Sequence, residues 1–189
     1  MPITTIDPKT ALIVIDLQAI MAHIPTAHPF DSILANAVRL TDAFRARSLP
    51  VVLVNVAGSP TGRTDQTSAQ DSNEGKEMPE GWSDLLPALN QQPTDKTITK
   101  YTWGAFHNTD LANHLAELGV TQVVICGVST SQGVESTARQ AHEHGYHVAL
   151  PIDAMTDTNH AAHDNSITHI FPALGETGTT ADILALLDA

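Results

Sequence analysis

Hydrophobic residues occur in this chain as short continuous runs, and the runs are separated by stretches with helical spacing. The first run, Ala11–Ile15, is typical of a strand that is buried on both faces of a sheet. Similar runs recur at regular intervals along the chain. The pattern predicts a central strand at Ala11–Ile15 and further strands at Val51–Val54, Thr97–Thr99, Gln122–Cys126 and Tyr146–Leu150.

The intervening stretches repeat apolar residues every three or four positions, which predicts helices. These helices are expected at Asp31–Arg47, near Thr109–Leu118, at about Ser131–His144 and at Thr179–Leu187. Because strands and helices alternate, the fold class is α/β, with a mostly parallel sheet flanked by helices in a three-layer, Rossmann-like α/β/α arrangement. A length of 189 residues and a hydrophobic content of 42% suit a single domain, 1–189.

The stretch from Gly58 to Gly81 differs from this pattern, since it is rich in small and polar residues and has few apolar ones. It predicts a long loop. Long loops inside compact domains are surface connections or lids over active sites, and both interpretations stay open. The Gly175–Gly178 segment is expected to be a simple turn that leads into the last helix.

The charge balance favours a small-molecule substrate. With 21 acidic and 9 basic residues the formal net charge is −12, which argues against nucleic acid or an anionic membrane as a partner. No run reaches the roughly 20 apolar residues that a bilayer span needs, and the first residues lack the blocks of a signal peptide. The single cysteine, Cys126, cannot form an intrachain disulfide, so a cytoplasmic location is expected.

Polar residues that follow apolar strands are the first candidates for chemistry, because ligands of doubly wound sheets bind at the carboxyl ends of the strands. Asp16 and Gln18 follow the first predicted strand, Lys100 follows the third, and the turn Gly127–Gly133 follows the fourth. Each also has an ordinary structural explanation: a helix cap, a solvated charge and a tight turn.

Four segments in the same order resemble the isochorismatase-like hydrolase family. The segments are Ala11–Gln18, Lys100–Phe106 with Thr109–Leu111, Val124–Thr130 and Gly133–Arg139. The resemblance implies a parallel sheet with flanking helices, a homodimer or homotetramer, and a catalytic set of Asp, Lys and Cys. Asp16 and Lys100 match the first two members of that set.

The third member is absent, because Gly133 stands where most of the family has the nucleophilic cysteine. Cys126 lies seven residues earlier in an apolar strand, where a cysteine is usually an inert core residue. The isochorismatases that name the family resemble this arrangement, with glycine at that position, and hydrolyse a vinyl ether without a covalent intermediate. In that chemistry the aspartate donates a proton, so burial of Asp16 should raise its pKa while Lys100 should lower it.

Five further residues are candidates for substrate binding: Gln18, Arg63, Trp103, Phe106 and Ser129. Arg63 could hold a carboxylate or be a solvated loop arginine, and Trp103 and Phe106 could form a pocket wall or pack in the core. The named isochorismatases carry an aromatic residue where this chain has Ser129.

No metal or other cofactor is expected. The nicotinamidase branch of the superfamily carries an Asp and His metal cluster after its second strand, but Val54–Gly58 offers none. The spacing of the histidines also lacks a metal signature.

Three hypotheses for function remain open at this stage. The first is a non-covalent hydrolase of a small anionic substrate of the vinyl-ether type, with Asp16 as general acid, Lys100 as electrostatic partner and backbone amides near Ser129 and Gly133 polarising the substrate. The second is an amidohydrolase fold that has lost its nucleophile and binds a ligand or partner without turnover. The third is an amidohydrolase whose cysteine has been replaced by Gly133 through engineering.

Overall fold

The strands form a single twisted sheet in the computed structural model, which describes residues 2–58, 60, 62–65 and 78–189. The strands are β1 (Thr10–Ile15), β2 (Val51–Val56), β3 (Lys96–Lys100), β4 (Gln122–Val128), β5 (His147–Pro151), β6 (Met155–Thr156) and β7 (Glu176–Gly178). Their order across the sheet is β3-β2-β1-β4-β5-β7, and β6 pairs with the end of β4. All of these pairings are parallel, which confirms the predicted α/β class.

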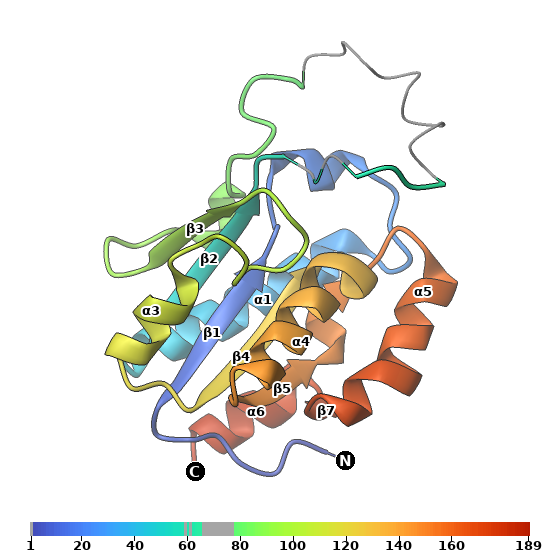
Figure 1. The fold of residues 1–189 in the computed structure, drawn as a ribbon. Helices are drawn as coiled ribbons and strands as arrows, with labels where there is room; N and C mark the ends of the chain where they lie inside the picture. Colours follow the sequence, from blue (N-terminus) through green and yellow to red (C-terminus); the bar gives the residue numbers. More distant parts are fainter. Residues whose placement is uncertain (1, 59, 61, 66–77) are drawn as a thin grey trace.

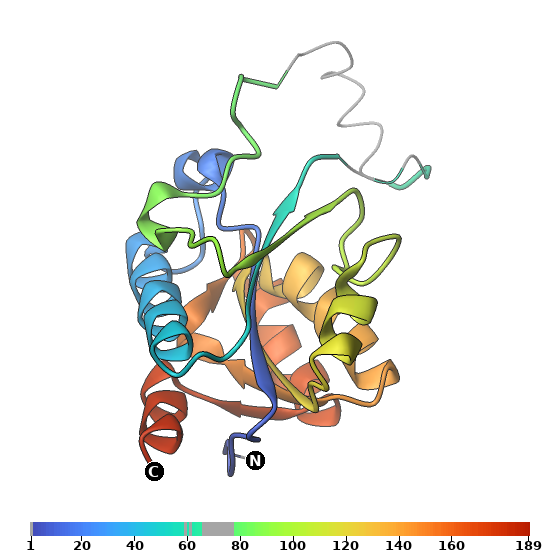
Figure 2. The ribbon, with the colours of Figure 1, turned by 90° about the vertical axis from the view of Figure 1, so that its left-hand side faces the viewer.

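Helices cover both faces of the sheet (Figures 1 and 2). On one face lie α1 (Phe30–Ala46) and α6 (Thr180–Leu187), and on the other lie α3 (Leu111–Glu117), α4 (Glu135–Glu143) and α5 (His160–Asn165). Side chains of a strand point alternately to the two faces, so β1 supplies two separate cores. Its Ile13 and Ile15 pack with α3 and α4, whereas Leu12 and Val14 pack with α1 and α6.

Short helical turns connect several of these elements. They are the 3₁₀ turns η1 (Ala19–His23), η3 (Pro87–Leu89), η5 (Ile152–Ala154) and η7 (Phe171–Ala173), and the π-helical turns η4 (Thr130–Val134) and η6 (Ser166–Ile170). The turn η4 runs directly into α4. The helix predicted from about Ser131 therefore has a wider first turn than a regular α-helix.

The sequence prediction was wrong at the Gly175–Gly178 segment, which is not a simple turn. Its last three residues form β7, with Glu176 beside Ala149 and Gly178 beside Pro151 of β5. A strand of three residues is too short for an apolar run, and only its parallel pairing with β5 defines it. Most of the predicted Gly58–Gly81 loop lies outside the described residues, so the lid stays a prediction.

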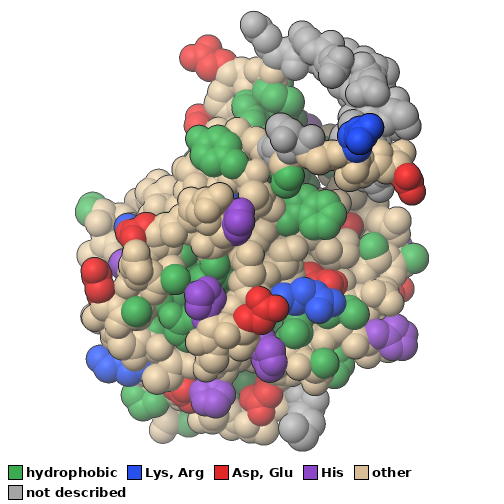
Figure 3. All heavy atoms as spheres, viewed as in Figure 1, with side chains coloured by type: hydrophobic (Ala, Val, Ile, Leu, Met, Phe, Trp, Pro, Cys, Tyr) green, Lys and Arg blue, Asp and Glu red, His purple; other side chains and the backbone are tan. Residues whose placement is uncertain are grey.

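The charged side chains on the surface reflect the acidic composition of the chain. On the face viewed in Figure 3, the Lys and Arg side chains of the described residues are few and lie among acidic groups. Within the described part of the chain, no helix has the length and apolar character needed to cross a membrane.

Candidate active site

The candidate catalytic residues meet at the carboxyl edge of the sheet. Asp16 directly follows β1, Lys100 is the last residue of β3, and Gly133 lies in η4 after β4. The chain leaves β1 toward β2 on one side and leaves β4 toward β5 on the other. The site therefore lies at the topological switch point, where doubly wound sheets bind their ligands.

Asp16 and Lys100 form a buried ion pair. The Nζ atom of Lys100 donates to Oδ2 of Asp16 at 2.7 Å and to the carbonyl of Thr102 at 3.2 Å. Asp16 is 7% exposed and Lys100 only 2%. Asp16 has a φ of +50°, so the regular alternation of β1 stops here and its carboxylate lies against Lys100. Non-glycine residues in this left-handed region are uncommon and concentrate at functional sites.

Burial has a larger effect on the pKa of Asp16 than Lys100 has. Burial raises the pKa of Asp16 to about 6, although the charge and the hydrogen bond of Lys100 act in the opposite direction. Its second oxygen, Oδ1, is buried and has no hydrogen-bond partner among the described residues. A carboxyl group with this pKa can donate a proton near neutral pH.

Gly133 lies close to this carboxyl group, with little room for a side chain. A Cβ atom built on Gly133 would lie 3.2 Å from Oδ2 of Asp16, 3.3 Å from the carbonyl oxygen of Val128 and 2.8 Å from Cγ2 of Ile15. The α-carbon of Gly133 therefore faces the Asp16 carboxylate. A side chain at this position would point into the site and would crowd Ile15.

A second glycine permits the close approach of β4 to β1. Gly127 has a φ of +117°, and a Cβ atom on it would lie 2.0 Å from the carbonyl oxygen of Ile15. Only glycine fits this backbone conformation and this contact. The turn after β4 can thereby lie directly beside the end of β1, which places η4 next to Asp16.

The cysteine of the chain has the surroundings of a core residue. Cys126 is fully buried in β4 and packs in the cluster on the α1 face of the sheet. Burial raises the pKa of its thiol to about 12, so at neutral pH the reactive thiolate is scarcely formed.

The structure places the five predicted substrate-binding residues in different surroundings. The Gln18 amide is occupied by the backbone of Val56, from whose N–H it accepts at 2.9 Å and to whose carbonyl it donates at 3.1 Å. Phe106 is buried in the core, with its ring centroid 4.9 Å from that of His144. These contacts give both residues structural roles.

The other three predicted residues retain accessible side chains. Ser129 is half-buried and begins the turn into η4, after a cis peptide bond with Val128. Trp103 is 53% exposed, in the segment that follows Lys100, and Arg63 is exposed. These three residues therefore remain the candidates for contact with a substrate.

A buried residue that no sequence pattern singled out, Thr137, links two parts of the candidate site. Thr137 of α4 contacts both the Gly133 carbonyl and the segment that follows Lys100. Its position four residues after Gly133 on a helix is the only sequence signal for the first contact. The second contact joins residues 32 positions apart, and no local pattern predicts it.

No metal centre accompanies this site in the described part of the chain, where groups of three or more His, Cys, Asp or Glu side chains in metal-binding geometry are lacking.

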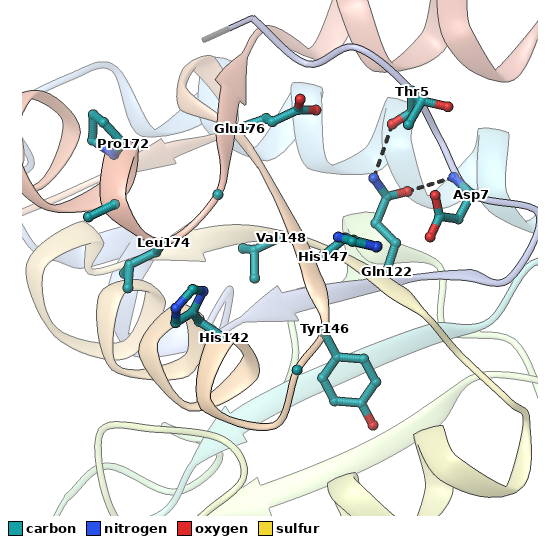
Figure 4. Close-up of a pocket in the computed structure, with 13 residues that line it drawn as sticks. Thr5, Asp7, Gln122, His142, Tyr146, His147, Val148, Pro172, Leu174 and Glu176 are labelled. Atoms are coloured by element: carbon teal, nitrogen blue, oxygen red, sulfur yellow. Dashed lines mark hydrogen bonds between the residues drawn. The ribbon is translucent and has the colours of Figure 1, made fainter.

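A separate pocket of about 620 Å³ lies at the opposite edge of the sheet, where β4 and β5 begin (Figure 4). The Gln122 amide in that pocket is already bonded to the backbone of Thr5 and Asp7. The pocket does not include Asp16, Lys100 or Gly133.

Comparison with known proteins gives one consistent family. An isochorismatase domain matches residues 10–182. The uncharacterised isochorismatase family protein YecD of Escherichia coli O157:H7 is 38% identical over 180 residues, covering 94% of this chain and 96% of YecD. YwoC of Bacillus subtilis, also an uncharacterised isochorismatase family protein, is 36% identical over 178 residues and 93% of both chains.

A solved structure agrees with these matches. An isochorismatase family protein from Burkholderia thailandensis is 37% identical and superposes with a TM-score of 0.87, covering 98% of both chains. The matched region of the domain includes Asp16, Lys100 and Gly133.

Proposed function

Because the chain belongs to the isochorismatase family of hydrolases, we propose that it hydrolyses a small anionic vinyl ether without a covalent intermediate, with Asp16 as the general acid. One observation carries the proposal. The Asp16 carboxyl, with its pKa raised to about 6, faces the α-carbon of Gly133, so an acid rather than a nucleophile stands at the centre of the site.

The proposed reaction begins with proton transfer from Asp16 to the terminal methylene carbon of the double bond. The electron pair of the double bond forms the new C–H bond and leaves an oxocarbenium carbon. Water adds to that carbon and returns a proton to the Asp16 carboxylate. The resulting hemiketal then breaks its bond to the ether oxygen as that oxygen gains a proton and the hydroxyl group loses one to form the ketone. For an enolpyruvyl ether the products are pyruvate and the free alcohol.

Lys100 serves this reaction by stabilising the carboxylate that Asp16 becomes after it has given up its proton. Its ammonium group already lies 2.7 Å from Oδ2, so no rearrangement is needed when the charge develops. The backbone amides near Ser129 and Gly133 polarise the substrate, and Trp103 and Arg63 are available at the surface to contact it.

The acid role of Asp16 predicts the pH profile. Because the pKa of Asp16 in the folded protein is about 6, its protonated form is present below that pH and is lost above it. We expect kcat/KM to fall about tenfold per pH unit above about pH 6. Measurement of kcat/KM from pH 5 to 9 checks this, and a profile that rises through this range would assign Asp16 the role of a base.

A second candidate function is that of an amidohydrolase-type protein which binds its ligand without turnover. Relatives named for other hydrolyses support the amidohydrolase-type site, whereas the loss of turnover rests on glycine at position 133. A streptothricin hydrolase of Streptomyces noursei is 32% identical over 160 residues, 84% of this chain and 57% of that protein. Nicotinamidase 3 of Arabidopsis thaliana is 29% identical over 171 residues, 87% of this chain and 83% of that protein. Such a protein would have Asp16 and Lys100 placed to activate a thiol at position 133.

Restoring that thiol separates the two candidates. If the second candidate is correct, Gly133→Cys gains amidase activity on a panel of small amides, whereas Gly133→Ala, which adds the same Cβ atom without the sulfur, gains none. Both variants should lose roughly 1–3 kcal/mol of stability because the added atom lies 2.8 Å from Ile15. Thermal unfolding measures this loss, and an unchanged midpoint would show that the Ile15 side chain moves aside without a cost in stability.

The proposed function itself is tested by pyruvate release. Purified protein is supplied with isochorismate and its 2-amino analogue, and pyruvate is measured beside an Asp16→Ala control. Release that disappears in the control supports the proposal. Absence of release from both compounds, with the variant and the original protein equally folded, would remove enolpyruvyl ethers of this kind as substrates.

A further inference from the structure

Thr137 connects the two walls of the candidate site through a single hydroxyl group. It is fully buried on α4, four residues after Gly133. Its hydroxyl donates to the carbonyl of Gly133 at 2.7 Å and accepts from the backbone N–H of Ala105 at 3.1 Å. One side chain therefore holds both η4 and the segment that follows β3.

The segment that follows β3 carries this connection back to Lys100. Lys100 donates to the Thr102 carbonyl at 3.2 Å, and the Thr102 hydroxyl donates to the Gly104 carbonyl, also at 3.2 Å. Ala105 is the next residue and is fully buried. The contacts thus form a chain from Asp16 to Lys100, through residues 102–105 to Thr137, and on to the carbonyl of Gly133. A Cβ atom on Gly133 would point back toward Oδ2 of Asp16.

A second contact from α4 fixes the same segment. Gln140 accepts from the N–H of Phe106 at 3.1 Å. A Cβ atom on Gly104 would lie 2.2 Å from the Oε1 atom of Gln140, so the segment passes directly against this side chain. Gln140 bonds to Phe106 on one wall of the site, whereas Thr137 bonds to both walls, at Ala105 and at Gly133.

We propose that Thr137 is a positioning residue, which holds Lys100 against Asp16 and holds Gly133 opposite their ion pair. The inference rests on the proposed function for its effect on rate, but its effect on the Asp16 carboxyl does not depend on any substrate. Without the hydroxyl, the buried N–H of Ala105 loses its acceptor on α4. The segment that carries the Thr102 carbonyl then keeps its bond to Gln140 but is held less firmly beside Lys100.

Weaker positioning of the segment has a defined consequence for the pKa of Asp16. Lys100 lowers the pKa of Asp16, by its charge and by its hydrogen bond, against the larger effect of burial. If Lys100 moves away from Asp16, this lowering weakens while burial remains. The pKa of Asp16 should therefore rise above about 6, and the fall in kcat/KM should move to higher pH.

Two substitutions at position 137 and one matched control test the proposal. Thr137→Val keeps the shape and removes the hydroxyl, whereas Thr137→Ser keeps the hydroxyl. Thr41→Val is the control, because Thr41 is also fully buried in a helix but its hydroxyl donates only to Val38 of the same helix, α1, on the other face of the sheet. Carbon-13 NMR of the Asp16 carboxyl reports its titration without any substrate.

We expect the Asp16 titration to move to higher pH in Thr137→Val, to return to its original value in Thr137→Ser and to stay unchanged in Thr41→Val. With an active substrate, kcat in Thr137→Val should fall roughly tenfold to a hundredfold, as for a displaced catalytic group. An unchanged titration in folded Thr137→Val, or an equal shift in Thr41→Val, would overturn the proposal. If no substrate is turned over by any variant, the proposed function fails, while the titration still decides the role of Thr137.

Discussion

Replacement of Asp16 by asparagine is expected to lower kcat about 10³-fold, within the range that a general acid contributes. Asparagine has nearly the same shape, tolerates the φ of +50° that Asp16 adopts, and can still accept from Lys100, but it has no proton of the required acidity. Steady-state kinetics at pH 5.5, where the original carboxyl is mostly protonated, measures the loss. Asp31→Asn, at an exposed position of α1, is the matched control and should leave kcat unchanged.

The stability of the same variant provides an independent check. The folded protein holds the Asp16 proton up to about pH 6, whereas an ordinary aspartate in the unfolded chain releases it near pH 3.8. Between these values the folded state binds more protons, so this carboxyl makes the free energy of unfolding fall as the pH rises. Asp16→Asn should lack this component of the pH dependence. An identical pH dependence in both proteins would show that the pKa of Asp16 is not raised.

Replacement of Lys100 by methionine is expected to lower both the rate of the reaction and the stability of the fold. Methionine is unbranched and apolar, so it keeps much of the volume and removes the charge. Loss of the ammonium removes the stabilisation of the Asp16 carboxylate, and we expect kcat/KM to fall about 10²–10³-fold. The pKa of Asp16 should rise further, because the influence that lowers it is gone.

The stability loss in Lys100→Met should depend on pH. Removing one partner of a buried ion pair leaves the other charge uncompensated, at a cost of about 3–5 kcal/mol. At low pH Asp16 is protonated and the cost is reduced, so thermal unfolding should show a larger loss at pH 8 than at pH 5. Lys96→Met on the same strand is the control, since Lys96 pairs with the exposed Asp110. Equal losses in the two variants would contradict a special role for the Asp16–Lys100 pair.

Sequence patterns predicted β1 to β5, but not the short strands β6 and β7, and they indicated where the candidate site lies. Continuous apolar runs are typical of strands covered on both faces, and β1 and β4 have this composition because helices pack on each side of them. Asp16 follows β1 and Lys100 ends β3, so their place at the carboxyl edge follows from the parallel order of the strands. The position of Gly133 beside them follows from the turn after β4.

The balance of forces on these residues could not be predicted from sequence. Whether burial or Lys100 dominates the pKa of Asp16 depends on how completely water is excluded, which is a property of the packed structure. Gln18 follows β1 as Asp16 does, yet its amide is occupied by the backbone of β2. Phe106 is near Lys100 in sequence but lies in the core, because the segment between them turns back onto α4.

The most direct test of the central claim is hydrolysis of isochorismate in water enriched in oxygen-18, with the products and the intact protein analysed by mass spectrometry. Non-covalent hydrolysis after protonation by Asp16 predicts equal amounts of pyruvate and ring product, a ring product that retains its original ether oxygen, and a protein of unchanged mass. Heavy oxygen in the ring product, a covalent adduct on the protein, or no pyruvate at all would contradict the account.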